Sequence, residues 1–243
     1  KERVEFRENN EEKYSLKEML QFLRNKPIWA AFAGTLIVGT GSSIAGGAGA
    51  YFYTYVLGDM KLMSGVSVIG LIASLVGIVM GPYLANRFGK KKVYLTAVII
   101  STALNLLRLL DVTSMILIYI SALIGGVAGG WMVPVNSSIQ ADNTTYVQYK
   151  TGKRAEAAIA SLTSFVSKVA QGLGGAIPGY VIAAYGFVTG ASVQPESINT
   201  GIILCALILP LIFGILGLLI FGTQYTLDQK AVIEMDAKIN RNN

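Results

Sequence analysis

The chain alternates between long apolar stretches and short polar segments, and the apolar stretches have the length of membrane-spanning helices. A helix rises about 1.5 Å per residue, so about 20 apolar residues cross a hydrocarbon layer of about 30 Å. The stretches cover residues 28–56, 66–84, 93–110, 114–135, 155–185 and 201–221. They predict an all-α membrane protein with six transmembrane helices.

Polar segments flank this predicted bundle of residues 28–222. Residues 1–27 carry mixed charge and are expected to form a cytoplasmic loop that contains an amphipathic helix. The helix is expected to open with a capping box at residues 15–18 and to stop before Pro27. Residues 223–243 form a polar cytoplasmic tail with a weak amphipathic period.

Three local patterns near the span ends lead to further predictions. Gly81-Pro82 is expected to end the second span. Arg108 and Asp111, three residues apart, are expected to pair with each other. Residues 142–154 are expected to form a charged loop between the fourth and fifth spans.

The composition supports a membrane protein and excludes several other classes. Of 243 residues, 53% are hydrophobic and 14% charged, whereas soluble domains carry roughly 25% charged residues. One cysteine, Cys205, and no histidine leave no disulfide and no Cys/His metal site. No nucleophile–base pair is recognisable, so we expect neither an enzyme nor a cofactor. The net charge is +6, but the basic residues lie in alternate loops, as orientation signals do. No nucleic-acid partner is therefore expected.

The basic residues predict the orientation of the chain. Seven precede the first span, four lie at 86–92, three at 142–154 and three in the tail. The loops on the other side hold Lys61, with Arg108 close by. Cytoplasmic loops carry the excess of Lys and Arg, so both ends of this segment are predicted to be cytoplasmic, in a multi-pass protein of the cell membrane. The chain opens on Lys1 with no signal-peptide pattern, and we expect it to be a piece of a longer protein.

A lone lysine, Lys168, lies deep inside the fifth span, about 20 Å along the helix axis from its start. The residues at helical spacing around it are polar or small. This Lys168 stripe consists of Ser161, Ser164, Lys168, Gln171 and Gly175. An intramembrane cation on a polar stripe indicates a water-filled cavity or a charged partner. A lysine bonded to backbone carbonyls, as a packing device, is the alternative.

No carboxylate of this chain is expected at the depth of Lys168. Asp111 lies at the outer end of the spans and Asp142 at the inner end. A counter-charge for Lys168 must therefore come from sequence beyond this chain.

A set of short motifs is spread over nearly the whole chain. They are Asn25-Lys26-Pro27, residues 51–58, residues 88–92, Ala141-Asp142, Tyr146, residues 150–156, Phe165, Lys168 and Gly172. Together they resemble the glycoside–pentoside–hexuronide:cation symporters, the melibiose-carrier-like branch of the major facilitator superfamily. The resemblance implies the C-terminal six-helix half of such a transporter. It also implies cation-driven sugar uptake by alternating access, with an N-terminal half as partner.

The same resemblance implies roles for individual residues. Lys168 is expected to lie near carboxylates of the N-terminal half that bind the coupling Na⁺, Li⁺ or H⁺. Thr163 and Ser164, five and four positions before it, match positions that contact sugar in the family. Three positions depart from the family's pattern. Thr145 and Asn86 stand where acidic residues are usual, and Val133 stands where the family has a tryptophan. The sugar and the coupling cation are therefore left open.

Further candidates come from the residues themselves. Cavity-lining candidates besides the stripe residue Gln171 are Tyr51, Tyr55 and Trp131, whose rings are suited to stacking on a sugar face. Inner-gate candidates are Arg87, Asp142, Lys150, Lys153 and Arg154. Two alternatives to a sugar symporter remain. One is a symporter of lysolipid or another solute with sodium, favoured by a wide apolar opening toward lipid, and the other is a membrane scaffold or sensor that transports nothing.

Overall fold

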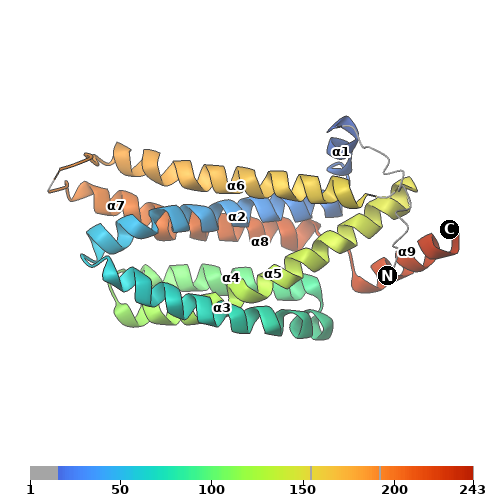
Figure 1. Ribbon diagram of the computed structural model, residues 1–243, viewed down its shortest axis with the longest axis horizontal. Coiled ribbons are helices and arrows are strands. Elements are labelled where there is room, and N and C mark those ends of the chain that lie inside the picture. The colour runs from blue at the N-terminus through green and yellow to red at the C-terminus, as the bar shows by residue number, and fades with distance from the viewer. Residues whose placement is uncertain (1–15, 154, 192, 243) are drawn as a thin grey trace, which may run out of the picture.

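The computed structural model describes residues 16–153, 155–191 and 193–242, and its long helices lie side by side in one bundle (Figure 1). The helices are α1 (Leu16–Phe22), α2 (Lys26–Tyr51), η1 (Phe52–Val56), α3 (Lys61–Phe88), α4 (Lys90–Arg108), α5 (Met115–Thr151), α6 (Glu156–Ala184), α7 (Ser197–Ile203), η2 (Leu204–Ile208), α8 (Leu209–Gln224) and α9 (Gln229–Asn242). The π-helical turn η1 continues α2, and η2 joins α7 to α8. Within the described residues, six long helical units therefore match the six predicted spans.

Four of these units are long and apolar enough to cross a membrane, judged over the described part of the chain. They are Lys26–Val56, Lys61–Phe88, Met115–Thr151 and Ser197–Gln224. The other two, α4 and α6, have 19 and 29 residues and run beside them with more polar positions (Figure 1). The predicted class, an all-α bundle, is confirmed.

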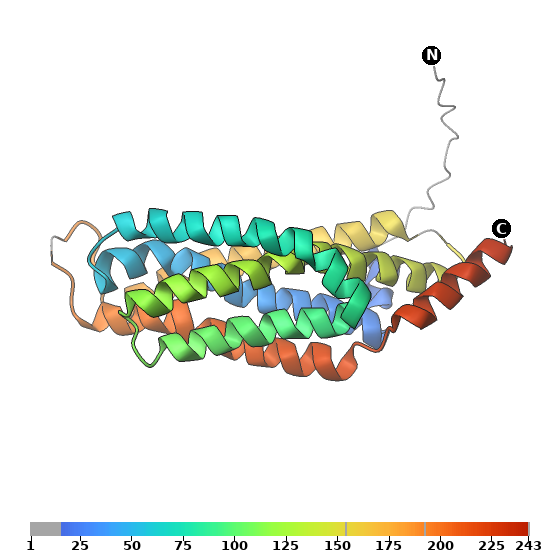
Figure 2. The ribbon, with the colours of Figure 1, turned by 90° about the horizontal axis from the view of Figure 1, so that it is seen from below.

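The six units are arranged in layers, which Figure 2 shows from the side. One layer holds α3 and α6, the middle layer α2 and α5, and the third α4 and α8. The main contacts pair α3 with α5, α2 with α6 and α8, and α4 with α5 and α8. An aromatic stack of Tyr94, Phe221 and Tyr225 closes the α4–α8 contact, with ring centroids 4.1 and 4.5 Å apart.

The α3–α5 and α2–α6 contacts depend on glycines that let the backbones touch. A Cβ added at Gly130 of α5 would overlap the carbonyl oxygen of Ser74 in α3. A Cβ added at Gly174 of α6 would overlap the Ser43 side chain of α2. In lipid, packing of this kind replaces the hydrophobic force that joins helices in water. These two contacts set how closely the layers approach.

The expectations about where two of the helices end are wrong. The second span does not end at Gly81-Pro82, because α3 continues to Phe88. Gly81 is buried against Pro134 of α5, so the neighbouring helix supports the segment that the proline interrupts. Residues 142–151 are not a loop either, because α5 runs on to Thr151 and ends at Gly152 in the left-handed conformation, with φ of 70°.

The expected pair of Arg108 and Asp111 does not form. The carboxylate of Asp111 instead accepts hydrogen bonds from the Thr113 backbone N–H (3.1 Å) and hydroxyl (3.0 Å) in a local turn. The Arg108 guanidinium lies over the Phe52 ring, 5.0 Å from its centroid. The local turn supplies hydrogen-bond donors to the Asp111 carboxylate, so the long Arg108 side chain need not be fixed beside it. The capping box at residues 15–18 includes Ser15, which lies outside the described residues.

The glycine contact between α3 and α5 can be tested with a neighbouring pair of substitutions. Gly130→Ala should lower the free energy of unfolding of the purified protein by about 1–3 kcal/mol, because the new methyl group meets backbone rather than a flexible side chain. Gly129→Ala, where the added Cβ meets nothing within 4 Å, should be neutral or stabilising. Titration with a denaturing detergent measures both, and equal effects would contradict the close contact.

Candidate functional site

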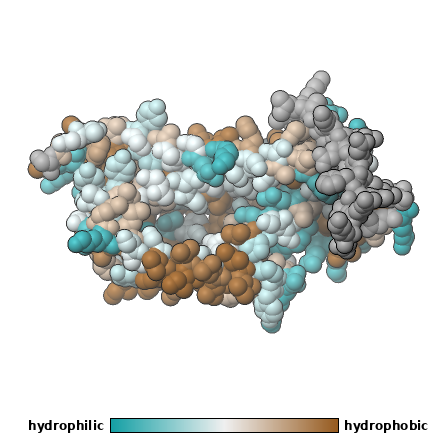
Figure 3. Space-filling view, viewed as in Figure 1, coloured by the Kyte–Doolittle hydropathy of each residue, from teal (hydrophilic) through white to brown (hydrophobic). Residues whose placement is uncertain are grey.

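The face of the bundle turned toward the viewer in Figure 1 is hollowed between α2 and α5 (Figure 3). A cavity of about 390 Å³ lies there, with α4 and α8 behind it. Its polar lining consists of Ser42 of α2 and Ser101, Thr102 and Asn105 of α4. No side-chain hydrogen bond to another described residue satisfies these four groups. The cavity is therefore equipped to bind water or a hydroxylated ligand.

A second cavity, of about 230 Å³, continues the first toward the end of α4. The two share Ser101 and Asn105, and the second also reaches Tyr53, Ser121 and Arg108. The Nε atom of Arg108 is buried and has no hydrogen-bond partner in the described part of the chain. We call the two joined cavities the polar hollow.

The sequence reasoning missed the residues of α4 that line the polar hollow. The signal was present, since Ser101, Asn105 and Arg108 follow one another at helical spacings of four and three on one face of an otherwise apolar span. It was not recognised because hydroxyl and amide groups in a span usually bond to the helix's own backbone or to a neighbouring helix. Thr96, earlier in α4, does so through the Lys92 carbonyl at 2.9 Å.

Lys168 lies on α6 with its side chain exposed, and it forms no hydrogen bond or ion pair with any described residue. It is about 18 Å along the axis from Glu156, where α6 begins. One half-turn further, Ala170 contacts α2 at Gly39, near the middle of the 31-residue unit Lys26–Val56. The lysine is therefore at mid-depth in the bundle.

The predicted stripe around Lys168 is exposed along its length. Ser161, Ser164, Gln171 and Gly175 are exposed on α6 as Lys168 is, and Ser161 also lines an apolar groove beside α2. The neighbouring Thr163 is half-buried, and its hydroxyl donates to the Ile159 carbonyl at 2.8 Å. The exposed polar groups of the stripe that lie outside the groove are thus Ser164 and Gln171.

The aromatic candidates lie away from Lys168. Tyr51 and Tyr55 stack with ring centroids 6.4 Å apart, and both meet the edge of Phe187. Tyr51 ends α2, about 18 Å beyond the level of Gly39, and Tyr55 follows one turn later in η1. Trp131 packs against the core beside Gly81, and its indole Nε1 is buried without a partner among the described residues. The structure does not bring these rings together with the lysine.

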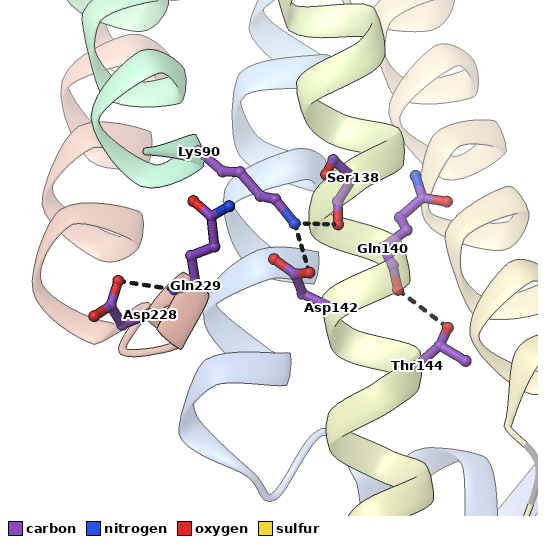
Figure 4. Close-up of polar contacts among 7 residues, drawn as sticks. All are labelled: Lys90, Ser138, Gln140, Asp142, Thr144, Asp228 and Gln229. Carbon is purple, nitrogen blue, oxygen red and sulfur yellow. Dashed lines mark hydrogen bonds and ion pairs between the residues drawn. The ribbon is translucent and has the colours of Figure 1, made fainter. Parts of the chain in front are cut away.

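At the opposite end of the bundle, basic residues tie α4 to its neighbours, and Figure 4 shows the contacts that Lys90 makes with α5. Lys90 donates to the Asp142 carboxylate at 2.6 Å and lies 3.5 Å from the Ser138 carbonyl oxygen. Lys91 donates to the Tyr225 carbonyl at 2.7 Å. A cavity of about 310 Å³ lies among these groups. Burial raises the pKa of the Tyr225 phenol above its ordinary value, and the charge of Asp142 raises that pKa further.

The inner-gate candidates are not equally available for new partners. Asp142 is already paired within this chain, and its position is helical rather than in a loop. Arg87 is exposed and donates to the Tyr83 hydroxyl at 2.9 Å, and Lys150 lies over the Tyr146 ring at 6.0 Å. Lys153 follows α5, where its backbone N–H donates to the Thr151 hydroxyl at 3.3 Å. Arg154 lies outside the described residues.

A layered bundle of long apolar helices around a polar hollow defines a multi-pass membrane protein. Residues 1–229 match the family model described as MFS/sugar transport protein, and the chain belongs to this family. The resemblance to the glycoside–pentoside–hexuronide symporters is thereby confirmed.

Relatives with curated names support this membership. The chain is 31% identical over 242 residues to the uncharacterized symporter YjmB of Bacillus subtilis (strain 168), covering 97% of this chain and 52% of the relative. It is 30% identical over 231 residues to the glucuronide carrier protein homolog of Escherichia coli (strain K12), covering 91% and 50%. It is 28% identical over 154 residues to the isoprimeverose transporter of Lactiplantibacillus pentosus, covering 61% and 31%. These relatives are named as transporters, and the chain spans about half the length of the first two.

The ion pair of Lys90 and Asp142 can be tested by a double-mutant cycle. The side chains are 19% and 9% exposed, so Asp142→Asn should lower the free energy of unfolding by about 1–3 kcal/mol. Adding Lys90→Gln should cost less in the Asp142→Asn background than in the wild type, because the lysine has already lost its partner. Lys92→Gln, at an exposed position two residues on, is the matched control. Additive effects in a denaturing-detergent titration would refute the coupling.

Proposed function

We propose that the chain is the C-terminal half of a cation-coupled sugar symporter that works by alternating access. The observation that carries the proposal is Lys168, an exposed cation at mid-depth with no partner among the described residues. Such a cation is costly against hydrocarbon, so it calls for water or an opposing charge. An N-terminal half of the same transporter would supply that charge.

The coupling follows from charge compensation. Carboxylates of the N-terminal half would bind Na⁺, Li⁺ or H⁺, and the Lys168 ammonium would neutralise them while no cation is bound. Cation binding would then release the lysine and change which arrangement of the two halves is favoured. The ion pair between Lys90 and Asp142 lies at the bundle end and leaves Lys168 available.

A sugar fits the groups on the hollowed face. Ser42, Ser101, Thr102 and Asn105 offer hydroxyl and amide groups in a cavity of about 390 Å³. Ser164 and Gln171 add exposed polar groups on α6. The names of the glucuronide carrier homolog and the isoprimeverose transporter support a sugar as the substrate class. No sugar contact is assigned to the other predicted cavity residues, which are Tyr51, Tyr55, Trp131 and Thr163.

The proposed orientation places both ends of this segment in the cytoplasm, with the protein in the cell membrane. Helices α1 and α9 lie at the same end of the bundle as the α3–α4 and α5–α6 connections (Figure 1). These segments hold most of the cations, including Lys90 to Lys92. The positive-inside rule assigns that end to the cytoplasm.

One observation favours transport of a lipid instead. An apolar groove of about 800 Å³ lies between α2, α6 and α8, as a lysolipid:sodium symporter would require. Ser164, Lys168 and Gln171 do not line this groove. Since the proposed coupling lysine does not line the groove, the sugar remains the better-supported substrate.

Substitution of Lys168 tests the proposed coupling. In the complete transporter, Lys168→Ala should abolish uphill sugar accumulation driven by a cation gradient, because carboxylates of the N-terminal half would then lack compensation. Lys61→Ala, at the exposed first residue of α3, is the matched control and should transport normally. Uptake of radiolabelled glucuronide into vesicles measures both. Undiminished accumulation by the Lys168→Ala variant would remove the lysine from the mechanism.

The polar hollow makes a separate prediction about sugar affinity. Asn105→Ala should raise the KM for the transported sugar about 5- to 30-fold, as expected for the loss of hydrogen bonds worth about 1–2 kcal/mol. Thr96→Ala removes a polar group from the same helix without touching the hollow and should leave KM unchanged. Concentration-dependent uptake measures this, and an unchanged KM in both variants would exclude Asn105 from the sugar site.

A further inference from the structure

The apolar groove lies between α2, α6 and α8, and the residues proposed for transport do not line it. Its wall includes Phe32 and Leu36 of α2, Leu162 and Phe165 of α6, and Ile220 of α8, and Ser161 is its one hydroxyl. Its volume is about 800 Å³. An engineered apolar cavity of about 150 Å³ already holds benzene, so this groove has room for a long hydrocarbon chain.

One end of the groove is closed by the short helix α1. Met19 of α1 and Leu23, the residue after α1, line the groove, and Trp29, 40% exposed, lines it just after α2 begins. Tryptophan is enriched where a membrane meets water, because its ring is apolar and its N–H is polar. This end of the groove therefore has the chemistry of the membrane interface.

Two cations stand at the same end. Arg24 follows Leu23 in the connection between α1 and α2, and Lys26 begins α2 three residues before Trp29. Both are exposed, and neither forms an ion pair within the described residues. Basic side chains at the interface attract anionic lipid headgroups, by about 1 kcal/mol for each cation. A hydrocarbon groove that ends at two free cations matches one ligand chemistry, an acyl chain attached to an anionic headgroup.

We infer that the groove holds a phospholipid with an anionic headgroup. The acyl chains lie along α2, α6 and α8, and the phosphate contacts Arg24 and Lys26. The bound lipid joins α1 to the bundle, since Met19 and Leu23 contact the chains from the other side. It is a structural ligand, because Ser164, Lys168 and Gln171 lie outside the groove. The inference does not depend on the proposed transport activity.

Lipid retention in the complete, purified protein tests this directly. The protein is delipidated, mixed with phosphatidylglycerol or phosphatidylcholine of identical acyl chains, and the bound lipid is counted by native mass spectrometry. Phosphatidylglycerol should be retained about 25-fold more strongly, or about fivefold for each of the two cations. Equal retention of the two lipids would overturn the inference.

Variants separate the headgroup from the groove. The double variant Arg24→Gln, Lys26→Gln should bind both lipids equally, at the level of phosphatidylcholine in the wild type. The double variant Lys92→Gln, Lys230→Gln removes the same charge at exposed positions away from the groove and should keep the preference. Loss of the preference in this control would show a diffuse surface attraction and would overturn the site.

A third variant tests the groove itself. Ala33, half-buried, lines the groove, and Ala33→Phe should reduce retention of both lipids by partly filling it. Full retention with Ala33→Phe would place the lipid elsewhere. A doubled particle mass without bound lipid would assign the groove to a second copy of the chain, and cation-driven accumulation of the lipid in vesicles would make it a transported substrate. Either result would overturn a structural lipid.

Discussion

Close contact through small residues is the constraint on which this bundle depends. Hydrocarbon is as apolar as a leucine side chain, so helices in a membrane gain little by covering apolar surface and must gain by close packing. Gly130 allows α5 to reach the backbone of α3 at Ser74, and Gly174 allows α6 to reach α2 at Ser43. The two pairs stand apart, and the polar hollow lies between them, with α4 and α8 behind it.

This arrangement separates two kinds of surface. The hollowed face carries unpartnered polar groups, among them Ser42 and Asn105. Lys168 is exposed on α6. An apolar groove lies between α2, α6 and α8, and Lys168 does not line it. In the proposed transporter, the polar groups meet the other half and the sugar, while the apolar groove meets lipid.

Much of the fold follows from the sequence, because apolar length and cation distribution are local properties. The six spans, the isolation of Lys168 and the small residues at close contacts are all visible in it. Helix ends were less predictable. Gly81-Pro82 and the charged run after Asp142 look like interruptions, yet packing against α5 and the Lys90 pair keep both segments helical. The residue at which a helix ends depends on the contacts that a neighbouring helix supplies. The hydrophobic period of the sequence does not contain that information.

By itself, the sequence determined the class of protein and the lone cation at mid-span, since the cost of charge in hydrocarbon depends only on residue type and depth. Tertiary structure alone decided which polar groups share a cavity. It placed Ser42 of α2 and Asn105 of α4 in one cavity, Ser161 on the wall of the apolar groove and Trp131 against the core. These outcomes depend on how far apart helices stand and how each is rotated, which interhelical packing sets and helical spacing does not.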